Sequence, residues 1–165
     1  MLLSDEVVVM RQLLPDDVDE WLAADDAEQV HWFEFPGPAP RRDVERAITA
    51  WSESRPIDGP VRYWAICDLE TGGLVGGVEL GDLGDSTVNL SYVVFPDFRR
   101  QGIATRASRL ALAYARDELG ARHARIEVLP DNVASLGVVQ NLGATFAGRG
   151  TNQAGRDLDA YELEL

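Results

Sequence analysis

Three short runs of β-forming residues follow one another in the middle of the chain, and they constrain the fold more than any other feature. They occupy residues 61–68, 74–80 and 86–95, and the connections between them, "LETGG" and "GDLGD", are rich in Gly and Asp. Connections this short join antiparallel neighbours through tight turns. The sequence therefore predicts an antiparallel meander at the centre of the fold.

A long helical stretch follows the meander. Residues 102–120 are rich in Ala, Leu and Arg, and Gly120 stands where a helix would end. Residues 123–129 then alternate between apolar and charged side chains, which is typical of a strand with one wetter face. Because a crossover helix makes the strands that it joins parallel, we expect strand 123–129 to run parallel to strand 87–95.

The remaining segments complete a mixed α/β pattern. The strand and helix signals outside the centre are a strand in 6–13, helices in 14–26 and 41–54, a short helix between Asn132 and Gly143, and strands in 144–150 and 158–165. This order predicts an α/β (α+β mixed) fold with a mostly antiparallel mixed sheet of about seven strands and about four flanking helices. A length of 165 residues fits a single domain, 1–165.

Composition excludes several kinds of chemistry. The chain has one cysteine, Cys67, and two histidines, so it assembles neither a disulfide framework nor a Cys/His zinc cluster, and we expect no metal. All 15 basic residues are arginines, which excludes a Schiff-base lysine and a P-loop lysine.

Charge and the N-terminal segment bear on partners and location. The formal net charge of -13 repels nucleic acid and anionic lipid and favours cationic or amine-bearing partners, although the charge can also serve solubility alone. Asp5 and Glu6 stand where a secretion signal would be basic, and no apolar run approaches the roughly 18 residues that cross a bilayer. We therefore expect a cytoplasmic protein with no membrane or nucleic acid partner.

The stretch "PDFRRQGIATRAS", residues 96–108, has the features of an anion site. A strand ends before it and a long helix begins after Gly102, so free backbone N–H groups gather where the helix dipole is positive. Three nearby arginines would add charge for a polyphosphate: Arg99, Arg100 and Arg106. The alternative is a simple turn with solvated arginines. Neither the dinucleotide-binding nor the P-loop pattern is present.

Two motifs resemble those of a known family. "RRQGIA", from Arg99 to Ala104, resembles the [RQ]-x-x-G-x-[GA] acetyl-CoA signature of the GNAT N-acetyltransferase superfamily. Tyr92 and the "FPDFRRQGIAT" that follows it resemble the family's tyrosine-bearing strand and the start of its third helix. From Asn132 to Gly143, N-x-x-S-x-x-V-x-x-N-x-G is similar to the pattern of the branch related to ribosomal-protein N-terminal acetyltransferases of the RimJ and RimL type.

The resemblance covers nearly the whole chain and implies acetyl-CoA as the co-substrate. In that fold the strands corresponding to 87–95 and 123–129 splay apart at their carboxyl ends, and pantetheine pairs with the first like an added strand. Asn132 would bond the pantetheine arm, although capping the helix that follows is an alternative role. The implied cofactor-binding residues are Val93, Val94, Arg99, Arg100, Gln101, Gly102, Ile103, Ala104, Thr105, Asn132 and Ser135.

Acyl transfer to an amine needs a base, an oxyanion donor and a proton for the departing thiolate. Glu79, inside an apolar strand beside the expected cofactor strand, is the candidate base, unless it points to solvent; Glu34 is a second candidate. The oxyanion donor would be the backbone N–H of Val93 or Val94. The tyrosine that often serves as the acid is absent, because Val139 occupies its place. Ser135 matches the serine of the RimL-like branch and would take that role, with hydrogen bonding at the start of its helix as the alternative.

The resemblance also implies an acceptor site near the first helix. Its expected residues are Trp32, Phe33, Glu34, Phe35, Tyr92, Tyr63 and Trp64, with the alternative that the aromatic ones belong to the core. The expected reaction is direct acetyl transfer to a primary amine, either a protein N-terminus or a small amine. Transfer of another acyl group, or a CoA-binding sensor without turnover, are the alternatives. Dimers are common in this branch, so a homodimer is also an expectation.

Overall fold

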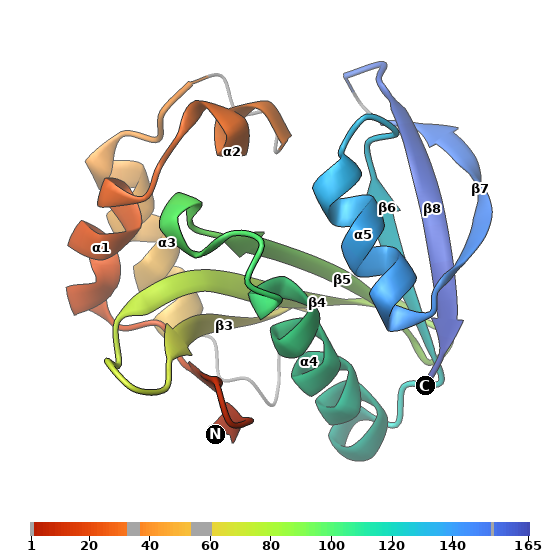
Figure 1. Ribbon diagram of the computed structural model, residues 1–165, viewed down its shortest axis with the longest axis horizontal. Helices are drawn as coiled ribbons and strands as arrows, with labels where there is room; N and C mark the ends of the chain where they lie inside the picture. Colours follow the sequence, from red (N-terminus) through yellow and green to blue (C-terminus); the bar gives the residue numbers. More distant parts are fainter. Residues whose placement is uncertain (1, 33–36, 54–60, 153) are drawn as a thin grey trace.

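A computed structural model describes residues 2–32, 37–53, 61–152 and 154–165. These form one open mixed sheet with the strand order β1-β2-β3-β4-β5-β6-β8-β7, together with five α-helices (Figure 1). The strands are β1 (Leu3–Ser4), β2 (Val8–Arg11), β3 (Val61–Asp68), β4 (Leu74–Gly84), β5 (Thr87–Val94), β6 (His123–Val128), β7 (Thr145–Thr151) and β8 (Asp157–Glu164). The helices are α1 (Val18–Ala23), α2 (Ala27–Trp32), α3 (Arg41–Glu53), α4 (Ile103–Leu119) and α5 (Val133–Leu142), with 3-10 turns η1 (Pro15–Asp17) and η2 (Pro96–Phe98).

The expected meander and the expected parallel pair are both confirmed. Strands β3, β4 and β5 pair antiparallel in sequence order, and β5 pairs parallel with β6 across the α4 connection. The β5–β6 pairing covers only Thr87–Asn89 against His123–Arg125. Beyond Asn89 the two strands diverge, and Figure 1 shows β5 and β6 separating toward opposite sides of the molecule. The predicted splay of the sheet is therefore present.

The differences from the predicted pattern are small and local. The eighth strand is β1, a two-residue strand too short to leave a periodic signal. Helix α2 was not expected, because its six residues contain no apolar repeat. Its start does carry a sequence signal: the Asp26 carboxylate accepts a hydrogen bond from the Gln29 backbone N–H at 2.8 Å, which is the usual N-cap contact.

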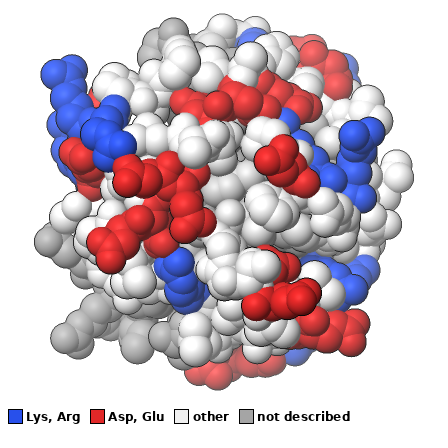
Figure 2. Space-filling model, turned by 60° about the vertical axis from the view of Figure 1, so that its left-hand side comes forward, with Lys and Arg blue, Asp and Glu red and all other residues white. Residues whose placement is uncertain are grey.

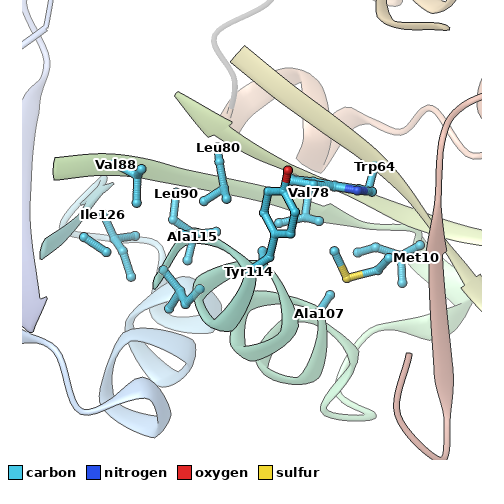
Figure 3. Packing of buried hydrophobic residues seen from close by; sticks show 14 of the residues in the cluster. Met10, Trp64, Val78, Leu80, Val88, Leu90, Ala107, Tyr114, Ala115 and Ile126 are labelled. Atoms are coloured by element: carbon cyan, nitrogen blue, oxygen red, sulfur yellow. The ribbon is translucent and has the colours of Figure 1, made fainter. Parts of the chain in front are cut away.

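The core has two layers because alternate strand residues face opposite sides of the sheet. On one side, α4 packs on β4 and β5, and the ring of Trp64 meets that of Tyr114 edge-on with centroids 5.2 Å apart (Figure 3). On the other side, α1 and α3 cover a smaller cluster that includes Ile48 and Cys67. Trp64 is fully buried beneath α4, so this aromatic residue belongs to the core and not to an acceptor site.

Within the described residues, no helix combines the length and apolar character needed to cross a membrane.

Candidate active site

The N-terminus of α4 provides unpaired backbone donors. Gly102 is its N-cap residue, with φ = +79°, a left-handed conformation that glycine adopts without strain. No side chain caps this end, and the first backbone bond of the helix runs from Arg106 N to Gly102 O at 3.0 Å. The N–H groups of Ile103, Ala104 and Thr105 therefore have no acceptor within the helix. These amides at the positive end of a 17-residue helix suit an anion.

The arginines beside this terminus are arranged differently from the expectation. Arg99 donates to the Asp26 carboxylate at 2.8 and 3.0 Å and also contacts Glu28, while Arg106 pairs with Asp5 at 2.9 Å. Their charges are thus compensated by acids 73 and 101 residues away in the sequence, which a local pattern does not reveal. Among the residues that the structure describes, Arg100 has no ion pair. The expected concentration of three free positive charges is therefore reduced.

Arg99 links the end of β5 to α2. Its Nε donates to the Val94 carbonyl at 3.0 Å while its guanidinium nitrogens bind Asp26, and these hydrogen bonds hold the pKa of the Asp26 carboxyl below its ordinary value. On the other side, Arg156 in the β7–β8 connection donates to the His31 carbonyl at 3.3 Å. In Figure 1, α2 and this connection both lie at the end of the molecule where β5 and β6 diverge. The two arginine contacts therefore hold α2 over the splay.

Three expected acceptor-site residues, Phe33, Glu34 and Phe35, lie outside the described residues. Trp32 is the last residue of α2 and donates from its indole N–H to Glu28 at 3.3 Å. It therefore belongs to the segment that Arg99 and Arg156 hold over the splay.

The backbone of β5 presents polar groups toward the splay. Phe95 N donates to Val75 O on β4 at 2.9 Å. Because the hydrogen-bonding direction alternates along a strand, the backbone N–H and C=O of Val93 also point toward β4, whereas those of Val94 point away from it. A Cβ on Gly76 would lie 2.2 Å from Val93 O, which explains why glycine stands at this position of β4. The N–H of Val94 is therefore the better oriented of the two candidate oxyanion donors.

Glu79 lies on the sheet face covered by α1 and α3, directly opposite Tyr63 on β3 and Ser91 on β5. It is half-buried, and burial raises the pKa of its carboxyl above the ordinary value. Glu79 is therefore neither fully solvated nor fully buried, and its role as the base stays a prediction. A carboxylate with a raised pKa next to a diverging strand is suited to accept a proton.

Tyr63 shares this face and was expected only as a wall of the acceptor site. Its ring stacks on Trp51 with centroids 4.3 Å apart and an interplanar angle of 8°. Its hydroxyl would be 1.9 Å from a Cβ on Gly77, so it rests directly against the β4 backbone. Burial, together with the charge of Glu79, raises the pKa of the phenol, which keeps the hydroxyl protonated.

Asn132, Ser135 and Tyr92 form the opposite wall of the splay. The Asn132 side chain accepts the Ser135 N–H at 3.0 Å, so it caps α5, as the alternative for this residue predicted. Tyr92 donates from its hydroxyl to the Ser135 carbonyl at 3.4 Å, which connects β5 to α5 across the splay. Burial raises the pKa of Tyr92.

Tyr92 and Glu79 lie on opposite faces of the sheet, because Tyr92 pairs with Val78 whereas Ser91 pairs with Glu79. Tyr92 was expected with the acceptor-site residues, but it stands with Ser135 instead. The two candidate catalytic residues, Glu79 and Ser135, are thus brought to the two sides of one diverging strand.

A mixed sheet that splays beside an uncapped helix terminus is the arrangement that the resemblance to the GNAT superfamily implies for acetyl-CoA binding. The sequence profile described as "Acetyltransferase (GNAT) domain" matches residues 8–145. The chain therefore belongs to the GNAT acetyltransferase family. No curated protein matches the chain in sequence.

Solved structures show the same fold. A GCN5-related N-acetyltransferase from Brucella melitensis is 25% identical, with a TM-score of 0.82 over 99% of this chain and 78% of that chain. The ribosomal-protein-S5-alanine acetyltransferase from Vibrio fischeri is 13% identical, with a TM-score of 0.83 over 99% of this chain and 96% of that chain. The spermidine N-acetyltransferase from Vibrio cholerae, in complex with CoA and spermine, is 16% identical, with a TM-score of 0.80 over 97% of this chain and 96% of that chain.

Sequence reasoning missed two features of the site, which are the ion pairs of Arg99 and the packing role of "GG" in β4. The glycine pair did carry a signal, since glycine inside a strand often marks a close approach of another backbone or side chain. Here Gly76 admits the Val93 carbonyl and Gly77 admits the Tyr63 hydroxyl.

Proposed function

We propose that this protein, as one domain over residues 1–165, transfers the acetyl group of acetyl-CoA to a primary amine by direct attack. One observation carries the proposal: β5 diverges from β6, Glu79 on the neighbouring strand β4 lies on one face of the sheet, and Ser135 lies across the splay on the other face. An amine approaching from the Glu79 side would then meet the thioester while the thiolate departs on the Ser135 side. This arrangement places a base and an acid on opposite sides of the thioester.

The cofactor-binding residues fit acetyl-CoA. The amides from Gln101 to Thr105, opened by the left-handed Gly102, would hold the pyrophosphate. The Val94 carbonyl, which accepts from Arg99 and has a second lone pair, would accept from pantetheine in the gap left by β6, and the Val94 N–H is left for the thioester oxygen. The Asn132 side chain uses its carbonyl oxygen in the α5 cap and keeps its NH₂ group for the pantetheine arm. Arg100, whose charge is uncompensated among the described residues, would assist the phosphates.

Each proton in the reaction has a carrier. Bound acetyl-CoA supplies the activated acetyl group. Glu79 takes the proton that the attacking nitrogen loses, directly or through water, and the Val94 N–H stabilises the charge that develops on the carbonyl oxygen. The carbon–sulfur bond then breaks and its electron pair stays on the sulfur. The thiolate takes the proton of the Ser135 hydroxyl, and solvent water replaces that proton on Ser135. Because a thiolate leaves readily, we expect the loss of this acid to matter less than the loss of the base.

The acceptor is an amine, either a protein N-terminus or a small amine. The acidic surface supports a cationic acceptor, and Figure 2 shows acidic side chains gathered over much of the face that carries α1 and α3. A single cysteine fits a reducing compartment, so we assign the reaction to the cytoplasm. A homodimer stays a prediction.

The test is acetyl-CoA-dependent turnover with a panel of amines, followed as CoA release. We expect Glu79→Gln to lower kcat about 10²- to 10⁴-fold, the usual contribution of a general base. Ser135→Ala should lower it by a smaller factor, and Gly102→Glu should weaken acetyl-CoA binding. As a matched control, Glu70→Gln in the exposed β3–β4 turn should change neither. Binding of acetyl-CoA without turnover of any amine would refute the proposal and favour a sensor.

A further inference from the structure

The Tyr63 hydroxyl lies close to the end of β5, on the sheet face that carries Glu79. It lies directly over Gly77, since a Cβ on that glycine would be 1.9 Å from the hydroxyl oxygen. Gly77 pairs with Val93 on β5. Glu79 pairs with Ser91, which is two residues farther from the end of β5. The hydroxyl is therefore closer along the strands than the Glu79 backbone to the place where the thioester would lie.

Packing holds the Tyr63 ring in this position. The ring stacks on Trp51 of α3 with an interplanar angle of 8°, and it meets the ring of Trp21 of α1 edge-on with centroids 6.0 Å apart. Two helices thus fix the ring against β4. A group fixed in this way needs no reordering when a substrate arrives.

The hydroxyl itself is not used by the packing. Among the residues that the structure describes, it has no hydrogen-bond partner, and burial raises the pKa of the phenol, so water solvates it poorly. Removing a hydroxyl from water without giving it a partner costs about 1–3 kcal/mol in proteins. A phenylalanine would make the same ring contacts without this cost. Ring packing alone therefore does not account for a tyrosine at this position.

Glu79 is near the hydroxyl but does not bind it. Gly77 and Glu79 are two residues apart on β4, which corresponds to about 7 Å along the strand. The charge of Glu79 contributes to the raised pKa of Tyr63, yet no hydrogen bond joins the two side chains. A hydroxyl has one proton to donate and two lone pairs that accept. Tyr63 is therefore able to accept from an amine N–H and to donate toward Glu79 at the same time.

We propose that the Tyr63 hydroxyl passes the proton of the attacking amine to Glu79, which makes Tyr63 a further catalytic residue of the reaction. The inference rests on the proposed function, because it takes the reacting nitrogen to lie between the thioester and Glu79. It replaces direct contact between the amine and Glu79 with a relay through a hydroxyl of fixed position.

The relay conserves protons and charge. As the nitrogen bonds to the acetyl carbon, one N–H bond breaks and its proton bonds to the Tyr63 oxygen. The proton already on that oxygen moves to the Glu79 carboxylate, directly or through one water molecule. The phenol ends neutral, as it began, and Glu79 later releases its proton to solvent.

The first test is Tyr63→Phe, which removes the hydroxyl and keeps the ring on Trp51. The acceptor is the panel amine that the wild-type enzyme acetylates fastest, with benzylamine and trialanine amide as first probes. We expect kcat to fall about 10²-fold, the lower end of the usual contribution of proton transfer, because water can replace the hydroxyl in part. The KM for acetyl-CoA should not change. The matched control is Tyr161→Phe on β8, a ring packed edge-on against Phe146, which should keep the wild-type kcat.

Two further readouts distinguish a relay from a packing role. If both residues carry the same proton, Tyr63→Phe combined with Glu79→Gln should be no slower than Glu79→Gln alone, whereas independent losses would multiply. Because the hydroxyl makes no hydrogen bond to the described residues, Tyr63→Phe should melt at or above the wild-type temperature. The melt also checks that the variant is folded.

The outcomes separate the two proposals. A kcat of Tyr63→Phe within about twofold of wild type would overturn the relay and leave the proposed function standing. Losses that multiply in the double variant, or a Tyr63→Phe that melts well below wild type, would also overturn the relay. Failure of the wild-type protein to acetylate any amine would refute the proposed function, and the relay with it.

Discussion

Replacing Gly76 with alanine should destabilise the protein although it adds only one methyl group. The new Cβ would lie 2.2 Å from the Val93 carbonyl oxygen, whereas real Cβ contacts are at least 3.0 Å, so about 0.8 Å of movement is required. Both atoms are fixed to the backbone, and no side chain can rotate to relieve the contact. The strands β4 and β5 must therefore separate at the position where β5 begins to face the splay.

The magnitude follows from two opposing effects. Forcing extra volume into a packed site costs about 1–3 kcal/mol. Alanine in place of glycine inside a strand otherwise stabilises by roughly 0.5–1 kcal/mol, because glycine loses more backbone entropy on folding. The matched control is Gly81→Ala on the same strand, where the added Cβ would make an ordinary 3.8 Å contact with Asn89. Because the entropy gain is common to both variants, we expect them to differ by the overpacking cost, about 1–3 kcal/mol.

Thermal unfolding followed by circular dichroism measures this difference. For a chain of this size, 1 kcal/mol corresponds to a shift of about 2–4 °C, so Gly76→Ala should melt about 2–12 °C below Gly81→Ala. Acetyl-CoA binding should weaken in the same variant, because the Val94 amide moves with Val93. Melting temperatures within about 1 °C of each other would refute the account of Gly76 as the residue that lets β4 approach β5.

Three further predictions concern stability and titration. Because burial raises the pKa of Glu79 in the folded state, its contribution to folding stability is fully present below the unfolded pKa and is lost as pH rises through the folded pKa. Glu79→Gln, which stays neutral, should therefore have a higher melting temperature than wild type at about pH 8, and the difference should close toward about pH 4. Arg99→Met should raise the pKa of Asp26 toward its ordinary value, as measured by NMR titration of the Asp26 carboxyl carbon; an unchanged pKa would contradict the Arg99–Asp26 ion pair. Asn132→Ala should remove the α5 cap and cost about 1 kcal/mol, whereas Asn132→Ser should retain most of it, as judged by denaturant unfolding.

Much of the fold could be predicted because its signals are local. The bounds of β3 and the order of β4, β5 and α4 follow from runs of β-forming residues, short Gly and Asp turns and one long helical stretch. The direction of β6 follows from the crossover helix. Helix α2 escaped prediction because six residues provide too few turns for a periodic pattern, and because its position depends on Arg99 and Arg156 from distant segments.

The candidate site divides in the same way. Gly102 and Asn132 were identified from motifs, since their roles at helix starts depend on neighbours a few residues away. The ion pairs of Arg99 and Arg106 were not predictable, because Asp26 and Asp5 approach these arginines only in the folded chain. The face on which Tyr92 lies was not predictable either, because it depends on a strand register that places Ser91, and not Tyr92, opposite Glu79.

By itself, then, the sequence determined the order of the elements, the splay-forming crossover and the helix terminus that suits a pyrophosphate, all of which arise from backbone preferences over a few residues. Only the tertiary structure decided how charge is distributed around that terminus, on which face of the sheet Glu79 lies and on which Tyr92 meets Ser135, and why two adjacent glycines are needed in β4. These depend on which strands pair and in what register, and pairing is settled by contacts between residues far apart in the chain.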